Sequence, residues 1–346
     1  MRVSRATVTA VAAAFVLVAC GGEAGGPALE GEDQGGSFDG ERLTLAVPTS
    51  PGSSFDTWAR TIAPRLGEAL DTDVVVDNQP GASGLVALND MIKEGADGST
   101  LVLWQIGPLA IMQLQGAEEL RFDLQDLSYV GSFGGADHML FSGKDTPLED
   151  VEDLRSADEV RFASGTSGSL GFTSQQVVSD VLELDADFIT GFDDQSERMV
   201  AIERGDADAV IGPVRTFETI GRLDDVRPVL RLVNERSEKF PDVPTATEVD
   251  GIDDDDREVL QTHFDMAAAF YTLIGPPQMP DAELEELRET VWSVANDEEF
   301  VAELADSGLT VSPENEYLQG DEVVDLTSNL LDVPQRYQDL VDELAE

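Results

Sequence analysis

The side chains that could do chemistry in this chain are small hydroxyls beside glycines, gathered in three polar loops. The loops cover residues 48–54, 77–84 and 164–171, and each follows a short apolar run and leads into a helical pattern. A helix N-terminus presents backbone N–H groups without intrahelical partners, and the helix dipole adds partial positive charge there. These loops therefore predict anion binding, although ordinary strand–helix connections that bind nothing share the same pattern.

A catalytic interpretation finds little support in the residue types. The two histidines, His138 and His263, have no metal-type spacing to other ligands, so we expect no metal and no cofactor. Residues 165–169 miss the nucleophile elbow because Ser169 stands where that motif needs glycine. We expect no enzyme; the alternative from another class is a two-domain α/β hydrolase with Ser167 as nucleophile. A purely structural envelope lipoprotein is a third interpretation.

Strand and helix patterns must position these loops. Residues 42–47 alternate as in a strand, and Ser53 or Ser54 is a suitable N-cap for the helical pattern that follows. Pro64 inside that pattern should kink or interrupt the helix. Strand–helix–strand–helix–strand over residues 42–104 indicates a parallel sheet with helices on its faces. The first two loops then lie at the carboxyl ends of strands, where open α/β sheets bind ligands.

The remaining patterns extend the same α/β alternation. We interpret the four consecutive aspartates at 253–256 as solvated surface. Strands are expected over residues 129–133, 139–142, 161–163, 188–190, 209–213 and 226–233, with a buried strand over 263–274. Helices are expected over residues 85–95, 148–157, 172–182, 281–295, 297–305 and 335–344.

The charge of the chain is unusual. It holds 21 basic and 70 acidic residues, a formal net charge of −49. Such a surface repels phosphate, which argues against nucleic-acid binding. Because apolar periodicity continues through nearly the whole chain, we attribute the charge to life in high salt, where counterions screen the repulsion, rather than to disorder.

The N-terminus predicts export. Arg2 and Arg5 precede an apolar run at residues 6–18 that is too short to span a bilayer comfortably, and the run ends at Cys20. It resembles the lipobox of bacterial lipoproteins, which implies a signal peptide over residues 1–19 and lipidation of Cys20. The alternative is an ordinary signal peptide with a chance cysteine. Residues 20–41 are expected to be a flexible tether to the outer face of the membrane.

Several motifs in register resemble the substrate-binding receptors of tripartite tricarboxylate transporters, also called Bug receptors. The resemblance covers about residues 42–310 and implies an α/β fold, the two-domain type II periplasmic-binding-protein or Venus flytrap fold with a central cleft. It implies domain I at 42–141 plus 269–346 and domain II at 142–268. The matching motifs are Pro48-x-x-Pro51-Gly52-x-x-x-Asp56-x-x-Ala59-Arg60, Val74-Val75-Val76-x-Asn78-x-Pro80-Gly81-Ala82-x-Gly84, Ala96-Asp97-Gly98-x-Thr100-Leu101, and Phe240-Pro241-Asp242-Val243-Pro244-Thr245 with Glu248.

The resemblance also implies a ligand-binding site for a small organic carboxylate in the cleft. Its loops fall on Ser50, Gly52, Ser53, Ser54 and Asp56, on Ala82, Ser83 and Gly84, on Ser164, Gly165, Thr166 and Ser167, and on Phe192, Asp193 and Asp194.

Several of these positions allow two interpretations. Asp56 either caps and stabilises its helix or contacts the ligand. Asp193 and Asp194, which stand where the family has a Lys and a Gly, either face the cleft, where they would disfavour a tricarboxylate and favour a ligand with a cation-bearing or neutral tail, or face solvent. Arg198 and Arg215 are either countercharges or surface residues. Trp104 either walls the cleft or packs in the core.

The sequence therefore predicts a solute receptor. It is expected to close around its ligand by a hinge motion and to deliver it to the membrane subunits of a transporter. We expect a monomer that touches the membrane through its lipid anchor alone. The clamp on one ligand carboxylate is expected between the loops at residues 50–54 and 164–167.

Overall fold

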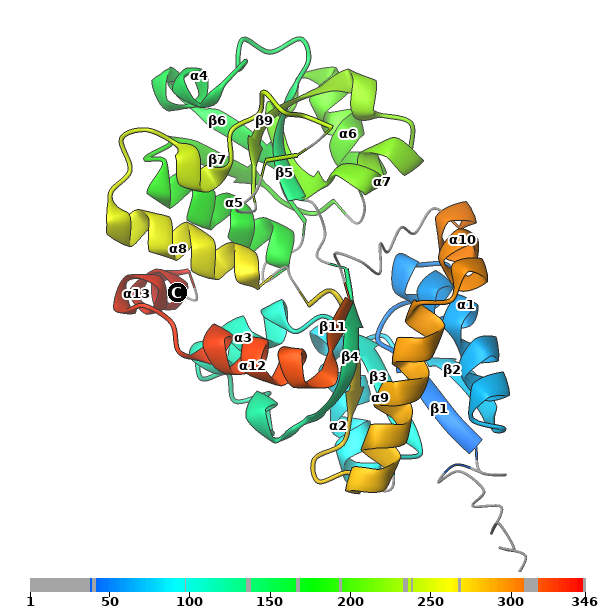
Figure 1. Ribbon diagram of the computed structural model, residues 1–346. Coiled ribbons are helices and arrows are strands. Elements are labelled where there is room, and N and C mark those ends of the chain that lie inside the picture. The colour runs from blue at the N-terminus through cyan, green and yellow to red at the C-terminus, as the bar shows by residue number, and fades with distance from the viewer. Residues whose placement is uncertain are drawn as a thin grey trace, which may run out of the picture. The chain divides into compact units, whose positions relative to one another are not determined.

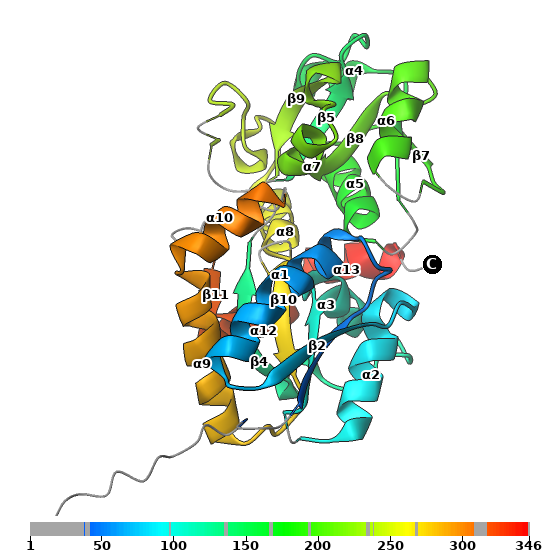
Figure 2. The same cartoon turned by 90° about the vertical axis from the view of Figure 1, so that its right-hand side faces the viewer.

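The computed structural model describes Phe38 and most of the chain from Arg42 to Leu344. The described residues are 38, 42–96, 98–134, 138–165, 169–192, 195–232, 236–237, 239–266, 269–307 and 317–344. They form two mixed sheets, each covered by helices on both faces (Figures 1 and 2).

The first sheet has six strands in the order β11-β4-β10-β3-β1-β2. Strand β1 lies parallel to β2 and β3, whereas β10 runs antiparallel to β3 and β4, and β11 antiparallel to β4. Because β1, β2 and β3 are parallel, the loops that follow them share one edge of the sheet. The strands are β1 (Arg42–Val47), β2 (Asp73–Asn78), β3 (Thr100–Trp104), β4 (Ser128–Phe133), β10 (Tyr271–Gly275) and β11 (Tyr317–Gln319).

Helices cover both faces of this sheet. Helix α1 packs beside α9 and α10, and α3 packs beside α12 (Figure 1). The helices are α1 (Ser54–Ala69), α2 (Leu85–Glu94), α3 (Gly107–Leu114), α9 (Asp281–Ala295), α10 (Glu298–Asp306), α12 (Gly320–Leu331) and α13 (Gln335–Glu343), with short 3-10 turns η1 (Ala82–Gly84) and η2 (Leu124–Asp126).

The second sheet has five strands in the order β7-β6-β8-β5-β9 and repeats the first sheet's topology. Strand β6 lies parallel to β7 and β8, and β5 runs antiparallel to β8 and β9. Strands β7-β6-β8-β5-β9 thus correspond to β2-β1-β3-β10-β4. The strands are β5 (His138–Gly143), β6 (Val160–Ala163), β7 (Ala186–Ile189), β8 (Ala209–Pro213) and β9 (Val226–Arg231).

The alternation of side chains divides the helices of the second sheet between its two faces. Leu140 and Ile211 join the large core cluster that includes residues of α4, α5 and α8. Their neighbours Met139, Phe141 and Val210 point the other way, into a second cluster with residues of α6 and α7. The elements are α4 (Val151–Ser156), α5 (Leu170–Val181), α6 (Gln195–Arg204), α7 (Val214–Thr219), α8 (Asp254–Asp265), η3 (Leu223–Asp225) and η4 (Ala246–Glu248).

Most expected elements are present, and the fold class is confirmed, but three expectations are wrong. Residues 263–265 end helix α8, and only 271–275 form a strand. The buried residues Val259, Leu260, His263 and Phe264 lie on one face at helical spacing. The acidic run at 253–256 begins this helix, with Asp253 as N-cap; Asp256 is half-buried.

Pro64 does not interrupt α1, which continues to Ala69. The helix expected at 148–157 spans only Val151–Ser156. The structure also has three helices, α3, α7 and α12, in segments where the sequence analysis predicts none, besides α8. Helix α12 has a recognisable signal, because its buried residues Val323, Thr327 and Leu330 repeat at helical spacing.

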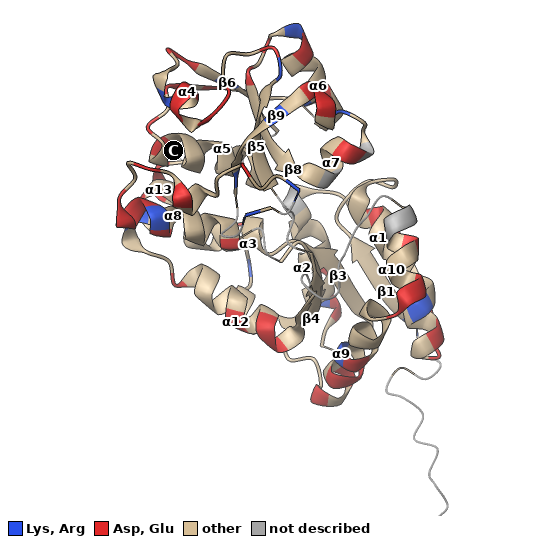
Figure 3. Cartoon of the chain, turned by 45° about the horizontal axis from the view of Figure 1, so that its top comes forward, with Lys and Arg blue, Asp and Glu red and all other residues tan. Residues whose placement is uncertain are grey.

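The acidic residues recur along the helices, with few basic residues between them (Figure 3). No helix in the described part of the chain combines the length and the apolar character that a membrane span needs.

Candidate functional site

The β1–α1 loop ends at a well-formed helix N-terminus. Ser53 is the N-cap of α1, and its Oγ accepts a hydrogen bond from the Asp56 N–H at 3.1 Å. Ser50, Gly52 and Ser54 are exposed. The N–H groups of Ser54 and Phe55 stand at the start of the helix, where no intrahelical acceptor is available. The loop can therefore offer N–H groups and hydroxyls to an anion.

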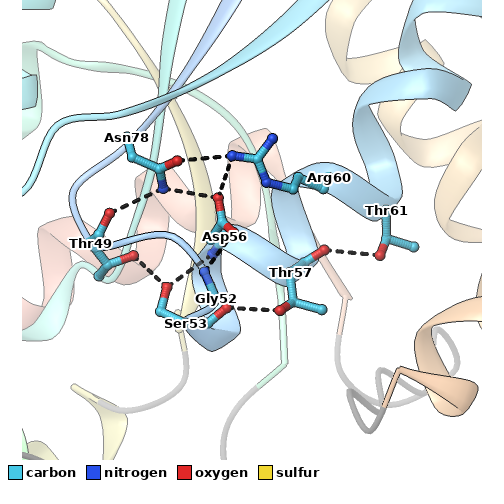
Figure 4. A network of polar contacts seen from close by, with 8 residues as sticks. All are labelled: Thr49, Gly52, Ser53, Asp56, Thr57, Arg60, Thr61 and Asn78. Atoms are coloured by element: carbon cyan, nitrogen blue, oxygen red, sulfur yellow. Dashed lines mark hydrogen bonds and ion pairs between the residues drawn. The ribbon is translucent and has the colours of Figure 1, made fainter.

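The Asp56 carboxylate, 3 % exposed, holds this loop from inside (Figure 4). Its Oδ2 accepts the Gly52 N–H at 2.8 Å. Its Oδ1 accepts Asn78 Nδ2 at 2.9 Å and lies 2.9 Å from Arg60 Nη2. Asp56 thus connects the turn at Gly52, the start of α1 and the end of β2.

Asn78 completes the network. Its amide nitrogen also donates to the Thr49 carbonyl at 3.1 Å, and its amide oxygen accepts Arg60 Nη2 at 2.9 Å. Thr49 Oγ1 and Ser53 Oγ lie 2.6 Å apart. Asn78 and Arg60 both lie within the sequence motifs, which by themselves assign them no role. Their signal was the placement of a side-chain amide directly at the end of β2, beside the loop that follows β1.

The network keeps Asp56 ionised. Burial alone would raise the pKa of the Asp56 carboxyl, but hydrogen bonds from Arg60, Gly52 and Asn78, with the charge of Arg60, outweigh it and lower that pKa. Of the two interpretations of Asp56, the geometry favours a structural one, because the contacts of both oxygens are within the protein.

The second loop turns tightly against a tryptophan. Residues Gly81, Ala82 and Gly84 have φ of 146°, 46° and 95°. A Cβ on Gly84 would lie 2.5 Å from Trp104 Nε1. Glycine is therefore required here for two reasons: its φ is positive, and no side-chain atom has room. Ala82 is exposed, and the side chain of Ser83 lies outside the described part of the structure.

Trp104 belongs to the core rather than to an open wall, since it is 7 % exposed. Its ring lies 4.9 Å from that of Phe55, which also packs against Phe270 and Tyr271 at 5.3 and 4.9 Å. Burial raises the pKa of Tyr271, against a hydrogen bond with the Ser54 side chain that lowers it. An aromatic cluster therefore supports the first loop from beneath.

The corresponding loop of the second sheet follows β6. Ser164 is fully buried, and its Oγ hydrogen-bonds Gln175 Oε1 on α5, whose Nε2 donates to the Ala163 carbonyl at 3.0 Å. Ser169 is the N-cap of α5 and accepts the Phe172 N–H at 3.3 Å. Gly165 is buried between them. Thr166 and Ser167 lie outside the described residues.

Arg198 lies beside this loop. Its Nη1 donates to Gln195 Oε1 at 2.8 Å, and its Nη2 would lie 3.2 Å from a Cβ on Gly165. Phe192 is half-buried against the core cluster beneath α6 and α7. Asp193, Asp194 and the side chain of Arg215 lie outside the described part of the structure.

The two histidines do not form a catalytic centre. His263 is 1 % exposed and lies between Ser174 Oγ, 2.8 Å from its Nε2, and Tyr337 Oη, 2.9 Å from its Nδ1. Burial lowers the pKa of His263 to about 3. The Ser174 hydroxyl also donates to the Leu170 carbonyl at 2.7 Å, within a helix. This hydrogen-bond chain joins α5, α8 and α13 and serves packing. No group of three metal-ligating side chains occurs among the residues described.

Two α/β domains, each with helix N-termini at the carboxyl ends of parallel strands, define the class of two-domain solute-binding proteins. Residues 58–319 match the family model described as the tripartite tricarboxylate transporter family receptor, TctC, and this chain belongs to that family. The resemblance found in the motifs is therefore confirmed. The chain is a solute-binding transport receptor and not an enzyme, and the hydrolase alternative finds no support.

Individual relatives agree with the family assignment. A UPF0065 protein of Agrobacterium vitis is 23 % identical over 277 residues, covering 79 % of this chain and 76 % of that relative. MatC of Rhodopseudomonas palustris, solved with bound malate, has a TM-score of 0.64 at 21 % identity, covering 87 % of this chain and 98 % of MatC. An adipate-bound protein of R. palustris has a TM-score of 0.64 at 21 % identity, covering 88 % and 97 %. These similarities establish the two-domain fold.

Proposed function

We propose that this receptor binds a small organic carboxylate between the loops at residues 50–56 and 82–84 and the loop at residues 164–167, by hinge closure. The observation that carries the proposal is the Asp56 network. It fixes the turn at Gly52 and leaves Ser50 and Ser54 exposed at the N-terminus of α1. A loop held in shape before binding loses little conformational entropy when a ligand arrives.

The solved relatives support the same ligand class. Malate and adipate, bound by the two R. palustris proteins, are both dicarboxylates. The site residues proposed for this chain remain those of the three loops together with Phe192 and Asp193. Asp56 acts in this proposal through Gly52, by shaping the loop, and the domain division at residues 141–142 and 268–269 is part of the same proposal.

A thermal-shift screen of the purified full-length chain tests the ligand class. The panel would hold malate, adipate, succinate, citrate, glutamate and aromatic acids, with neutral amides as controls, in high salt. A ligand at a hundred times its dissociation constant should stabilise the folded state by about 2.7 kcal/mol, a shift of several degrees. Stabilisation by the amides but by none of the acids would contradict the proposal.

A proline substitution tests the role of the α1 N-terminus. Ser53 has φ −69° and ψ 168°, an extended conformation that tolerates a following proline, and proline is well accepted at the first helical position. Ser54→Pro should therefore keep the helix but remove one N–H donor. We expect it to weaken binding of the screened acid about tenfold relative to Ser54→Ala, which loses the same hydroxyl. Equal affinities of the two variants would contradict backbone binding at this helix.

The location of the receptor is proposed from the N-terminal sequence. Cleavage before Cys20 and lipidation of its thiol would anchor residues 20–41 as a tether on the extracytoplasmic face of the membrane. Mass spectrometry of the membrane fraction should find a lipidated N-terminal peptide beginning at Cys20. Cys20→Ser should abolish that peptide, and an unmodified Cys20 in the mature chain would contradict the anchor.

The acidic surface is proposed to be an adaptation to high salt. A net charge of −49 destabilises a compact chain by self-repulsion, which counterions screen. The melting temperature should therefore rise with KCl concentration. Size-exclusion chromatography in the same buffers should give one monomer peak; a stability independent of KCl would contradict the adaptation.

A further inference from the structure

Helix α13 contacts elements of both sheets, although it follows the helices of the first sheet in the chain. It packs against α3, which follows β3 of the first sheet, and against α8 (Figure 1). Helix α8 in turn packs beside α5, which lies against β8 of the second sheet. The side chains of α13 therefore connect the two domains.

Two side-chain amides attach α13 to the end of α3. The amide nitrogen Nε2 of Gln115 donates to the Val341 carbonyl at 3.1 Å. In the other direction, Gln338 Nε2 donates to the Leu114 carbonyl at 3.0 Å. Gln115 is the C-cap of α3, so both bonds are made at the C-terminal end of that helix. Each helix thus donates one hydrogen bond to the other, which fixes α13 on the first domain.

A buried hydrogen-bond chain attaches α13 to α8 and α5. Tyr337 is fully buried, and its hydroxyl oxygen lies 2.9 Å from His263 Nδ1. The other ring nitrogen of His263 lies 2.8 Å from Ser174 Oγ on α5. Separating α13 from these helices would leave the tyrosine hydroxyl and an imidazole nitrogen without these partners, which is unfavourable for buried polar groups.

Arg336 adds a charged attachment beside this chain. Its guanidinium pairs with Asp180 of α5 and lies 3.6 Å from Asp256 of α8. Burial and the charge of Asp253 raise the pKa of the Asp256 carboxyl, and the charge of Arg336 lowers it. The cation that α13 contributes therefore offsets the repulsion among carboxylates of α5 and α8.

The end of α13 lies close to the starts of two helices. A small pocket is lined by Pro108 in the first turn of α3, by Phe172 and Thr173 in the first turn of α5, and by Leu344 at the end of α13. Both first turns follow the carboxyl ends of strands, where ligands bind in open α/β sheets. The ligand-side edges of the two sheets therefore approach each other beside α13.

We infer that α13 is a clasp between the two domains, and that Arg336, Tyr337 and Gln115 are positioning residues for ligand capture. A hinge motion that moves α5 away from α3 must break the contacts of α13 on one side or the other. The clasp therefore stabilises the arrangement in which the ligand-side edges of the sheets are close together. Because the apparent affinity falls with the population of the binding-competent state, loosening the clasp should weaken binding. This inference rests on the proposed carboxylate-binding function.

Isothermal titration calorimetry with malate and with adipate, on the full-length chain, measures the effect on binding. Arg336→Gln should weaken binding of both acids about threefold, the loss expected for a partly exposed ion pair. Arg336→Lys should recover part of that loss, because it keeps the charge. Gln115→Ala, on the other side of the clasp, should weaken binding about threefold to tenfold, as for a lost hydrogen bond.

Arg222→Gln is the matched control. The side chain of Arg222 is 40 % exposed, as is that of Arg336, and it also contacts two carboxylates. Those carboxylates, Glu203 and Asp225, lie in α6 and η3 of the second domain, so the pair does not connect the domains. Arg222→Gln should leave both affinities unchanged, and a loss equal to that of Arg336→Gln would overturn the inference.

The double variant of Arg336→Gln with Gln115→Ala separates a clasp from two local effects. A clasp needs attachment on both sides, so the double variant should lose no more affinity than the more affected single variant. Independent effects would multiply instead. Multiplied losses, or tighter binding in either single variant, would overturn the inference.

Small-angle X-ray scattering without ligand measures the clasp separately from binding. Arg336→Gln and Gln115→Ala should each have a larger radius of gyration than wild type and Arg222→Gln, because the domains separate more often; circular dichroism checks that all variants are folded. An unchanged radius in both clasp variants would overturn the inference. A wild type that binds neither acid contradicts the proposed function for these ligands, and the scattering comparison then decides on the clasp by itself.

Discussion

The β1–α1 loop and the β6–α5 loop occupy equivalent places in two sheets of the same topology, yet they are held in different ways. In the first sheet an ionised carboxylate, Asp56, receives hydrogen bonds from Gly52, Asn78 and Arg60. In the second sheet a neutral pair, Ser164 and Gln175, ties the strand end to α5.

The charge balance of the two loops differs as a result. The charges of Asp56 and Arg60 offset each other beside the β1–α1 loop. That loop therefore offers an anion only backbone N–H groups and side-chain hydroxyls. The second loop has no carboxylate among its described residues, and Arg198 lies against Gly165. Equivalent positions in a repeated topology are thus held by different contacts: a charge pair shapes the first loop, and a neutral side-chain pair holds the second.

The largest expected difference in stability comes from removing the side chain that holds each loop, Asp56 in the β1–α1 loop and Ser164 in the β6–α5 loop. Asp56→Ala removes the acceptor of the Gly52 N–H and one of the two acceptors of Asn78 and of Arg60, and should lower the free energy of unfolding by about 3 kcal/mol. Ser164→Ala leaves Gln175 bonded to the Ala163 carbonyl and should lower it by about 1 kcal/mol. Urea unfolding measures the free energy of unfolding of both variants, and equal losses would contradict the difference between Asp56 and Ser164.

Gly84 in the loop after β2 and Gly165 in the loop after β6 should differ next in the effect of an added methyl group. Gly84→Ala combines a positive φ of 95° with a 2.5 Å clash against Trp104 Nε1, a buried ring that has little room to move. We expect a loss of about 2.5 kcal/mol. Among the described residues, a Cβ at Gly165 would approach the ends of the Ser169 and Arg198 side chains, at 3.1 and 3.2 Å, so Gly165→Ala should lose about 1 kcal/mol or less. Thermal unfolding of the two variants compares them; the reverse order would show that Arg198 is fixed more rigidly than Trp104.

His263 and Asp56 should also make the stability depend on pH in different ranges. The pKa of His263 is about 3 in the folded state against 6.5 for an ordinary histidine, so the unfolded chain takes up the proton first. The stability should therefore decrease as the pH falls below 6.5, by about 2 kcal/mol at pH 5. His263→Gln, which does not titrate, should show a shallower decrease than wild type. Parallel pH profiles would mean that His263 titrates normally.

Asp56 should act at lower pH. Its pKa lies below the ordinary 3.8, so its stabilisation is complete above that pH and is lost as the pH falls through the folded-state value. Asp56→Asn should therefore differ from wild type by a constant amount between pH 5 and 8 and converge toward it in stronger acid. A difference that changes within pH 5 to 8 would place another titrating group in the network.

The smallest expected difference lies in the two N-caps. Ser53 Oγ contacts both the Asp56 N–H at 3.1 Å and Thr49 Oγ1 at 2.6 Å, whereas Ser169 Oγ accepts a single, longer bond from Phe172 N–H at 3.3 Å. Ser53→Ala should lower stability by about 1.5 kcal/mol and Ser169→Ala by about 0.5 kcal/mol. Denaturant midpoints at constant slope test this order, and equal values would show that the Thr49 contact adds nothing.

The sequence by itself determined the fold class, the family and most strands and helices. Short alternating runs such as residues 42–47 and the N-cap at Ser53 are local signals, because strand alternation and helix capping depend on neighbours in the chain. The motifs around Asp56 and Asn78 were visible for the same reason. The apolar run at 263–274 does not show its helical start, because the periodicity of helix α8 begins at Val259, four residues before the run.

Only the tertiary structure decided what these residues do. Asp56 and Asn78 are far apart in the chain, and the parallel pairing of β1 with β2 brings them to a 2.9 Å hydrogen bond. Arg198, in the first turn of the helix after β7, likewise comes close to Gly165, after β6, because β6 and β7 are parallel neighbours. The role of a charged side chain depends on the partners that the fold brings to it, and those partners come from distant segments of the sequence.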